Sequence, residues 1–183
     1  ADLSKFKSNN KEISMLAGMI SILARVLKEM PIFNSSLIDQ ERIIIKNYIN
    51  IGVAVSTEAG LVVPVIKNAD KKSVLEIAKD VSSLAKKARE KKLKKDEISS
   101  STFTISSLGK IGGVGFTPII NPPEVAIISL SRSKKELFFS KDKVKERELL
   151  PFAMSYDHRV IYGSDAGQFM ARIKELIETE SIS

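Results

Sequence analysis

Apolar residues recur at three- and four-residue intervals in three segments of the chain, and each segment predicts a helix. The first spans 13–30 and ends at the proline that follows, and its apolar residues lie on several faces, so we expect burial on more than one side. The second spans 72–92, with Ser73 as its N-cap. The third begins at a cap formed by Gly163 or Ser164. Its predicted buried stripe consists of Phe169, Ile173 and either Leu176 or Ile177.

β-Branched and alternating apolar residues predict strands at 42–56, 61–66 and 101–109, and another from Pro123 onward. Pro64 has no N–H to donate, so we place it at a sheet edge or a bulge. A hairpin is predicted around the sequence SKDK. The second arm of this hairpin is expected to place on one face Leu150, Phe152, Met154 and Tyr156. Without repeats or linkers, the pattern predicts one α/β (α+β) domain over 1–183, with a mixed β-sheet flanked by helices.

The composition is that of one globular domain. The chain has 183 residues, of which 43% are hydrophobic and 28% charged. It has no cysteine, which excludes disulfides and thiolate nucleophiles, and with a single histidine we expect no metal site. The most apolar window, 15–27, is shorter than the roughly 20 residues that a membrane-spanning helix needs. We therefore expect a soluble protein with no membrane partner.

The net charge is +7, and a basic run occupies 86–97, with the sequence KKAREKKLKKDE. Such a run can bind polyanions, but it contains no aromatic residues on which bases could stack. We interpret it as the solvated end of a helix and expect no nucleic acid as a partner. A binder of nucleic acid would instead be retained on DNA in a salt-sensitive way.

The only histidine, His158, lies where a predicted strand passes into a predicted helix. Its neighbours Asp157 and Arg159 are interpreted as an ion pair that fixes the loop. Ser106 and Ser107 end another predicted strand, so a hydroxyl and an imidazole could form either a nucleophile with its base or a base with an oxyanion donor. A structural histidine is the alternative. No G-x-S-x-G sequence surrounds the serines, which argues against a serine nucleophile.

Alternation along a strand places Ser106 and Ser107 on opposite faces, so only one of them can serve as the donor. The glycine-rich sequence KIGGVG follows at 110–115. We interpret it as a turn, because no helix N-terminus follows it as a phosphate-binding loop would require.

Two short motifs, FTISSLG at 103–109 and SYDHRVIYG at 155–163, carry a resemblance to a known family. Together with GVAVSTEAGLVVPV and PIINPPEVAIISLSRS, in order along most of the chain, they resemble the catalytic core domain of the dihydrolipoyl acyltransferases of 2-oxo acid dehydrogenase complexes. FTISS is most similar to the dihydrolipoyl acetyltransferase of the pyruvate dehydrogenase complex. The resemblance implies a chloramphenicol-acetyltransferase-like, trimeric fold.

The resemblance also implies the chemistry, which is acyl exchange between two thiol substrates, the lipoyl group as dihydrolipoamide and coenzyme A. His158 would be the general base and Ser106 the oxyanion donor, with no acyl-enzyme and no metal. The family motif reads D-H-R-x-x-D-G, and here Tyr162 occupies the position of its second Asp. Tyr162 can still form a hydrogen bond, but it carries no charge at neutral pH. Asp165 could substitute, or could simply be a first-turn helix residue.

The consequence of Tyr162 is left open by the sequence. The chain could be an active enzyme, a slowed enzyme, or a structural core without turnover. A chloramphenicol-type O-acetyltransferase, with the same base acting on a hydroxyl acceptor, is a further alternative, although the GLVVPV and NPPEVAI sequences favour the dehydrogenase-complex core.

The family's assembly implies the partners. Trimers place Ser106 of one subunit against His158 of the next and build a cubic or dodecahedral core. We find no lipoyl or subunit-binding domain, through which full-length relatives bind 2-oxo acid dehydrogenase and dihydrolipoyl dehydrogenase, and we expect truncation before the first helix. The expected location is the bacterial cytoplasm, or an organelle matrix in a eukaryote.

Overall fold

A mixed six-stranded β-sheet forms the centre of the protein. The computed structural model describes residues 1–6, 13–39, 41–109, 113–140 and 143–180. The strand order is β10-β7-β6-β3-β4, and β5 also pairs with β3. Only the β3–β6 and β6–β7 pairs are parallel, which confirms the mixed sheet. The strands are β3 (Ile51–Thr57), β4 (Gly60–Val62), β5 (Val65–Ile66), β6 (Phe103–Ser107), β7 (Ala126–Leu130) and β10 (Phe152–Tyr156).

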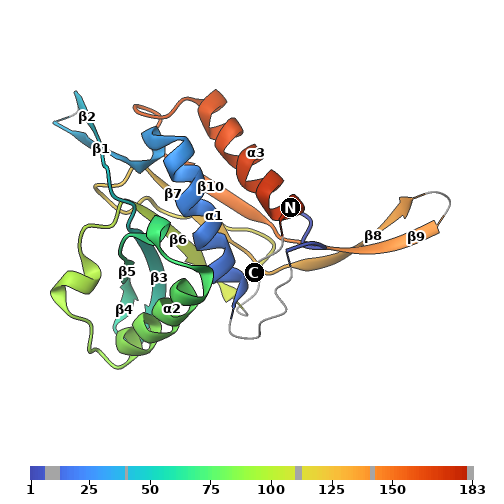
Figure 1. Ribbon diagram of the computed structural model, residues 1–183, viewed down its shortest axis with the longest axis horizontal. Helices are drawn as coiled ribbons and strands as arrows, with labels where there is room; N and C mark the ends of the chain where they lie inside the picture. Colours follow the sequence, from blue (N-terminus) through green and yellow to red (C-terminus); the bar gives the residue numbers. More distant parts are fainter. Residues whose placement is uncertain (7–12, 40, 110–112, 141–142, 181–183) are drawn as a thin grey trace.

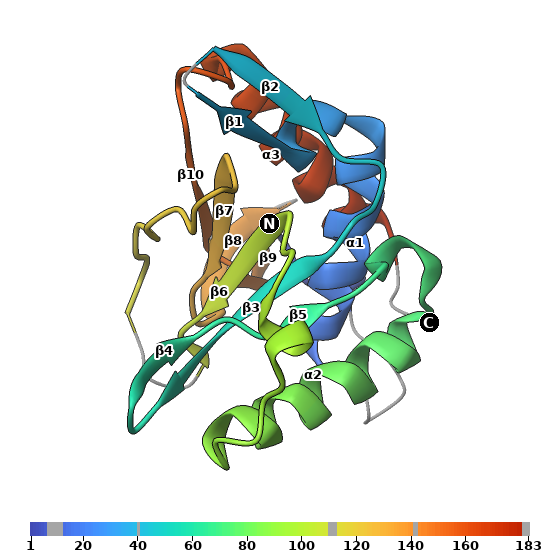
Figure 2. The ribbon, with the colours of Figure 1, turned by 90° about the vertical axis from the view of Figure 1, so that its left-hand side faces the viewer.

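Three helices lie on the same side of this sheet, as Figures 1 and 2 show: α1 (Met15–Glu29), α2 (Val74–Arg89) and α3 (Gly163–Thr179). α1 confirms the first predicted helix and its termination. Ile20 and Ile22, which lie about 200° apart around the helix axis, are both buried. Burial on more than one side is therefore confirmed. The described residues also form three short 3-10 helices, Pro31–Asn34, Ala69–Lys71 and Lys95–Ile98.

The caps of α2 and α3 differ in how well they were predicted. Ser73 caps α2 as predicted, since its hydroxyl accepts a hydrogen bond from the Glu76 N–H at 3.3 Å. The predicted cap of α3 at Gly163 or Ser164 is wrong, because Tyr162 is the N-cap. Its backbone is extended and the Asp165 carboxylate accepts its N–H at 3.4 Å, so the helix begins at Gly163, two residues earlier than with a Ser164 cap.

The buried stripe of α3 is confirmed, since Phe169, Ile173, Leu176 and Ile177 are all buried. The Phe169 ring stacks on Phe33 at 4.1 Å and lies 5.8 Å from the ring of Phe103 in β6. Phe103 and Ile105 therefore face the helices. Thr104 and Ser106 face the opposite side of the sheet, because alternate residues of a strand point to opposite faces.

Two predicted strand segments are divided in the structure. The segment 42–56 contains β2 (Arg42–Ile45), which pairs with β1 (Ser35–Ile38), and then β3. Between them the Asn34 amide donates to the carbonyls of Lys46 at 3.0 Å and Tyr48 at 2.9 Å, which fixes a bend. Pro64 separates β4 from β5, and its carbonyl accepts the Val53 N–H at 2.8 Å. This interruption confirms the predicted irregularity at Pro64.

The predicted hairpin around SKDK exists, but its second arm was placed wrongly. β8 (Lys134–Ser140) pairs with β9 (Lys143–Leu149), and the ribbon projects from the body of the molecule (Figure 1). The segment from Phe152 onward forms β10, which pairs with β7 in the central sheet. Pro151 lacks an N–H, so it interrupts the ladder between the two strands.

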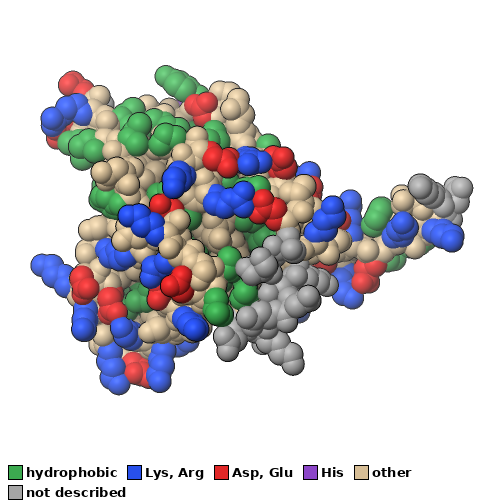
Figure 3. Space-filling model, viewed as in Figure 1, with side chains coloured by type: hydrophobic (Ala, Val, Ile, Leu, Met, Phe, Trp, Pro, Cys, Tyr) green, Lys and Arg blue, Asp and Glu red, His purple; other side chains and the backbone are tan. Residues whose placement is uncertain are grey.

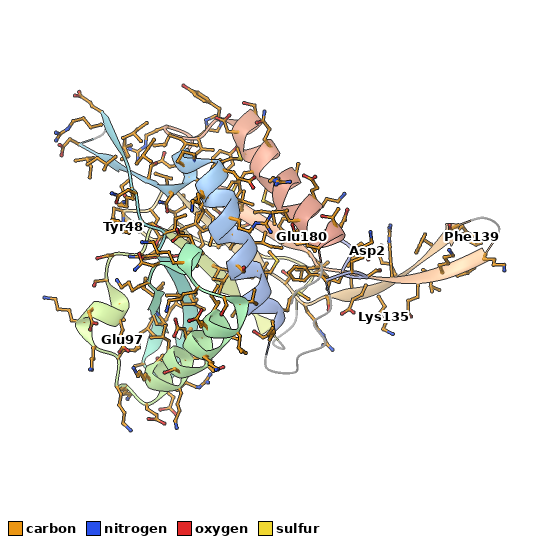
Figure 4. The ribbon with its side chains drawn as sticks, viewed as in Figure 1. Asp2, Tyr48, Glu97, Lys135, Phe139 and Glu180 are labelled. Carbon is orange, nitrogen blue, oxygen red and sulfur yellow. The ribbon has the colours of Figure 1, made fainter. Side chains whose placement is uncertain are left out.

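The basic run at 86–97 covers the end of α2 and the 3-10 helix after it, and acidic side chains are interspersed among the basic ones (Figure 3). Lys87 binds Glu97 at 2.5 Å, and Lys92 binds Glu90 at 2.9 Å. Figure 4 shows Glu97 beside the end of α2. The pairing fits the interpretation of a solvated helix end. Among the described residues, no helix is long and apolar enough to cross a membrane.

Candidate active site

Ser106 lies near the end of β6, on the face of the sheet that the helices leave free. Its neighbours in the ladder are Ala54 of β3 and Ser129 of β7. The side chain is half-buried and lines a cavity of about 410 Å³. Apolar side chains from β3, β4 and β7, together with Val63 and the segment 116–122, form most of the wall. A hydroxyl in such a wall can donate to an oxygen in a water-poor site.

Ser107 faces the other way and lines a different cavity, together with residues at the start of α1. This placement confirms that the two serines occupy opposite faces of β6. Part of the predicted glycine turn, 110–112, lies outside the described residues, so its geometry is not described.

His158 lies in the turn between β10 and α3, and it is exposed. The carboxylate of Asp157 accepts hydrogen bonds from Arg159 Nε at 3.0 Å and Nη2 at 2.6 Å, which confirms the predicted ion pair. These bonds hold the pKa of the Asp157 carboxyl below its ordinary value. The His158 ring lies 5.7 Å from the ring of Tyr156. Within the described part of the chain, the imidazole nitrogens have no hydrogen-bond partner, so they are free to meet a group from outside.

One chain does not bring Ser106 and His158 together. Ser106 of β6 lies opposite Ser129 of β7, and Ser129 lies opposite Ala153 of β10. His158 follows Ala153 by five residues. With strands about 4.8 Å apart and a rise of about 3.3 Å per residue, the two side chains are separated by on the order of 20 Å. A site that uses both residues therefore needs a second subunit.

The match to a known family covers nearly the whole chain. Residues 2–182 match the family described as 2-oxoacid dehydrogenases acyltransferase (catalytic domain). The chain belongs to this family. The predicted resemblance is thereby confirmed.

Curated relatives of the acyltransferase domain include the dihydrolipoyllysine-residue acetyltransferase component of the pyruvate dehydrogenase complex of Pseudomonas aeruginosa. It is 46% identical over 91% of this chain. The chain spans 30% of the length of that relative. The predicted likeness to the acetyl-transferring branch is confirmed at this level of sequence identity.

Superposition on solved structures agrees with the assignment to this family. The dihydrolipoamide acetyltransferase of Azotobacter vinelandii superposes with a TM-score of 0.87 and 45% identity, over 91% of this chain and 69% of the other. The cubic core of a pyruvate dehydrogenase multienzyme complex gives the same values. A chloramphenicol acetyltransferase, only 12% identical, superposes with a TM-score of 0.59 over 90% of this chain. That likeness confirms the predicted fold of the acyltransferase domain.

Tyr162, in the position of the family's Asp, points into solvent, with 67% of its surface exposed. Its N–H is bound to Asp165, so Asp165 is a first-turn residue of α3, as one of the two interpretations predicted. The acyltransferase domain thus presents a large neutral side chain four residues after His158, at the N-cap of α3.

Glu124 is a residue that the sequence analysis missed. It is only 6% exposed, and its Oε1 accepts hydrogen bonds from Thr104 Oγ1 at 2.8 Å and Asn121 Nδ2 at 3.1 Å. Burial raises the pKa of its carboxyl, against the opposing effect of hydrogen bonds from Ser101, Thr104 and Asn121 and of the charge on Lys46. The available signal was an acidic residue between a Pro-Pro pair and the mostly apolar strand β7.

We expect Glu124→Gln to change how stability depends on pH. In the wild type the folded-state pKa is raised, so the folded protein holds this proton more tightly than the unfolded chain does. The free energy of unfolding therefore falls as pH rises from the unfolded value of 4.5 through the raised pKa. The loss is about 1.36 kcal/mol for each unit of increase in pKa. Glutamine should remove this fall.

Urea unfolding at several values of pH tests this expectation. The free energy of unfolding of Glu124→Gln minus that of wild type should increase as pH rises from 4 to 8. Lys46 is the charged side chain that acts on this carboxyl, so Lys46→Met should steepen the fall in the wild-type background. Parallel curves for wild type and Glu124→Gln would contradict the raised pKa.

Proposed function

We propose that the acyltransferase domain transfers an acyl group, preferentially acetyl, between dihydrolipoamide and coenzyme A. Both thiols are substrates. His158 is the general base, and Ser106 is the oxyanion donor. The observation that carries this proposal is the pairing of a serine and a histidine with the spacing of a studied relative.

That relative is the Azotobacter acetyltransferase, in which the catalytic roles of a serine, a histidine and an asparagine have been investigated. Its serine precedes its histidine by the same number of residues as Ser106 precedes His158. Its asparagine follows the histidine by four positions, which is the position of Tyr162 here. The spacing supports the two assignments and marks Tyr162 as the departure.

The proposed chemistry needs one proton transfer and one hydrogen bond. The imidazole takes the proton of the attacking thiol, and the thiolate adds to the thioester carbonyl carbon. The resulting oxyanion accepts the hydrogen bond of Ser106. The carbon–sulfur bond to the leaving thiol then breaks, and the imidazolium returns the proton to that sulfur. An ordinary thiol and imidazole differ by roughly 2 pKa units, so the first transfer costs about 2.7 kcal/mol. A positioned general base can meet that cost.

We further propose that the working unit is a trimer in which each site combines two subunits. The separation of Ser106 from His158 within one chain supports this. Apolar side chains at the mouth of the Ser106 cavity also support it, since Ile119 is 91% exposed and Leu61 is 69% exposed. Exposed apolar groups in such a place are typical of protein interfaces.

Other apolar surfaces of the domain are also uncovered. Three successive isoleucines of β2, Ile43 to Ile45, are exposed and contribute to the green surface over the β1–β2 hairpin in Figure 3. On the projecting ribbon, Leu137, Phe139 and Val144 are exposed, and Figure 4 shows Phe139 near its tip. An isolated two-stranded ribbon is marginally stable in water, so contact with another subunit would stabilise it.

The wider assembly follows as part of the same proposal. Trimers would build a cubic or dodecahedral core to which 2-oxo acid dehydrogenase and dihydrolipoyl dehydrogenase bind. The expected location is the cytoplasm of a bacterium.

A second candidate function is a structural core that turns over slowly or not at all. Tyr162 is the observation that favours it. Acetyl transfer from acetyl-coenzyme A to dihydrolipoamide, measured on this chain and on Tyr162→Asp in parallel, separates the two candidates. A hydroxyl acceptor, chloramphenicol, in the same assay tests the O-acetyltransferase alternative.

We expect the two rates to differ by less than about tenfold, or about 1.4 kcal/mol, because the exposed Tyr162 forms no side-chain hydrogen bond within the described residues. Tyr162→Phe is the matched control and should match the wild type. Turnover that appears only in Tyr162→Asp would identify the chain as a disabled scaffold. Two inactive proteins that both assemble as trimers would contradict the roles given to His158 and Ser106.

A further inference from the structure

The wall of the Ser106 cavity includes an irregular segment. Residues 116–122 all line the cavity, yet they contain no helix or strand. Side-chain hydrogen bonds hold this segment in place. They run from Ser129 Oγ to the Phe116 carbonyl at 2.8 Å, from Ser155 Oγ to the Pro118 carbonyl at 2.6 Å, and from Asn121 Nδ2 to Glu124 Oε1 at 3.1 Å. The shape of the cavity therefore depends on a few polar contacts.

Glu124 holds the segment to the strand that carries Ser106. The same Oε1 that binds Asn121 accepts the hydroxyl of Thr104 at 2.8 Å. Thr104 precedes Ser106 by two residues, so both side chains lie on one face of β6, and both line the cavity. The Glu124 Oε1 atom thus links the 116–122 segment of the cavity wall to β6, the strand that carries Ser106.

Gly52 makes room for this arrangement. It pairs with Thr104 across the β3–β6 ladder. A Cβ atom at position 52 would lie 2.8 Å from Thr104 Oγ1 and 2.7 Å from Ser101 Oγ, which is closer than side chains tolerate. The glycine therefore allows the two hydroxyls to approach the Glu124 carboxyl.

The burial of Glu124 is costly for stability. Its Oε2 is buried without a hydrogen-bond partner among the described residues. A buried carboxyl group with an unsatisfied oxygen costs free energy that an apolar side chain would avoid. A role in stabilising the fold thus explains the residue poorly, whereas a role in shaping the adjacent cavity explains its contacts.

We propose that Glu124 is a positioning residue for acyl transfer. It fixes the position of the 116–122 wall relative to the hydroxyl of Ser106. This inference rests on the proposed function, in which the acyl thioester reacts beside Ser106. Glu124 acts through Thr104 and Asn121 and does not contact the substrate.

Variants of the two hydrogen-bonding partners test the proposal in the full chain. Glu124→Ala removes the shared acceptor, and we expect it to lower kcat for acetyl transfer by about 10- to 100-fold, because small displacements of a reacting group cost about that much. Glu124→Gln keeps an acceptor oxygen and should retain most of the activity. Thr104→Val removes the hydroxyl without changing the side-chain shape. It replaces Glu124→Ala in this test if Glu124→Ala does not fold.

Asp70→Asn is the matched control. Asp70 also has a buried oxygen without a hydrogen-bond partner in the described part of the chain, but it does not line the Ser106 cavity. Its variant should keep wild-type kcat. Thermal midpoints and trimer content are measured first, so that rates are compared between folded assemblies only.

The decisive measurement is a double-mutant cycle with Ser106→Ala. If Glu124 acts through the Ser106 site, adding Glu124→Ala to Ser106→Ala should lower kcat by less than about threefold. Fully additive losses, or equal losses in Glu124→Ala and Glu124→Gln, would overturn the proposal. A normal rate for Ser106→Ala alone would instead overturn the role of Ser106 in the proposed function.

Discussion

His158→Ala should lower the rate of acetyl transfer by about 10²- to 10⁴-fold, the range that a positioned general base contributes. The alanine side chain cannot take the proton of the attacking thiol, so the reaction must proceed from the small fraction of thiolate in solution. Because His158 is exposed and has no hydrogen-bond partner among the described residues, we expect unchanged folding and assembly. The measurement is the initial rate of acetyl-dihydrolipoamide formation at neutral pH.

The pH dependence separates loss of a base from loss of structure. The rate of His158→Ala should rise with pH as the thiol ionises, and the difference from wild type should narrow at alkaline pH. Gln168→Ala, a change at an exposed position of α3, is the matched control and should match wild type. A His158→Ala variant with a wild-type rate at neutral pH would remove the histidine from the mechanism.

Ser106→Ala should lower kcat by about 10²- to 10³-fold, the usual cost of removing one oxyanion donor. The hydroxyl is half-buried in a mostly apolar wall, where water cannot easily replace its hydrogen bond. Ser107→Ala is the matched control, because the neighbouring hydroxyl faces a different cavity on the other side of β6. Equal losses in the two variants would mean that the effect comes from the strand and not from the oxyanion.

Mixed trimers test whether the two residues come from different subunits. When Ser106→Ala and His158→Ala chains are unfolded, mixed in equal amounts and reassembled, about a quarter of the subunit boundaries should join a native Ser106 to a native His158. We therefore expect activity to return to about a quarter of the wild-type level. Mixtures no more active than either variant would show that each site uses residues of one chain.

Much of the secondary structure could be predicted, because periodicity records which side of an element is buried. The spacing of apolar residues located α1 and α2, and Ser73 was recognisable as a cap. The Tyr162 cap and the true partner of β8 were missed. Each of these depends on contacts that the local pattern does not contain, such as the bond from the Tyr162 N–H to Asp165 and the pairing of β10 with β7.

The sequence by itself determined the family, the order of helices and strands, and the identity of Ser106 and His158 as candidates, since motifs and alternation are local properties of the chain. Only the tertiary structure decided that these two residues lie far apart in one subunit. It also decided that Glu124 is buried against Thr104 and Asn121 beside the Ser106 cavity. Distances of this kind depend on how strands distant in sequence pair within the sheet, and no local pattern encodes that pairing.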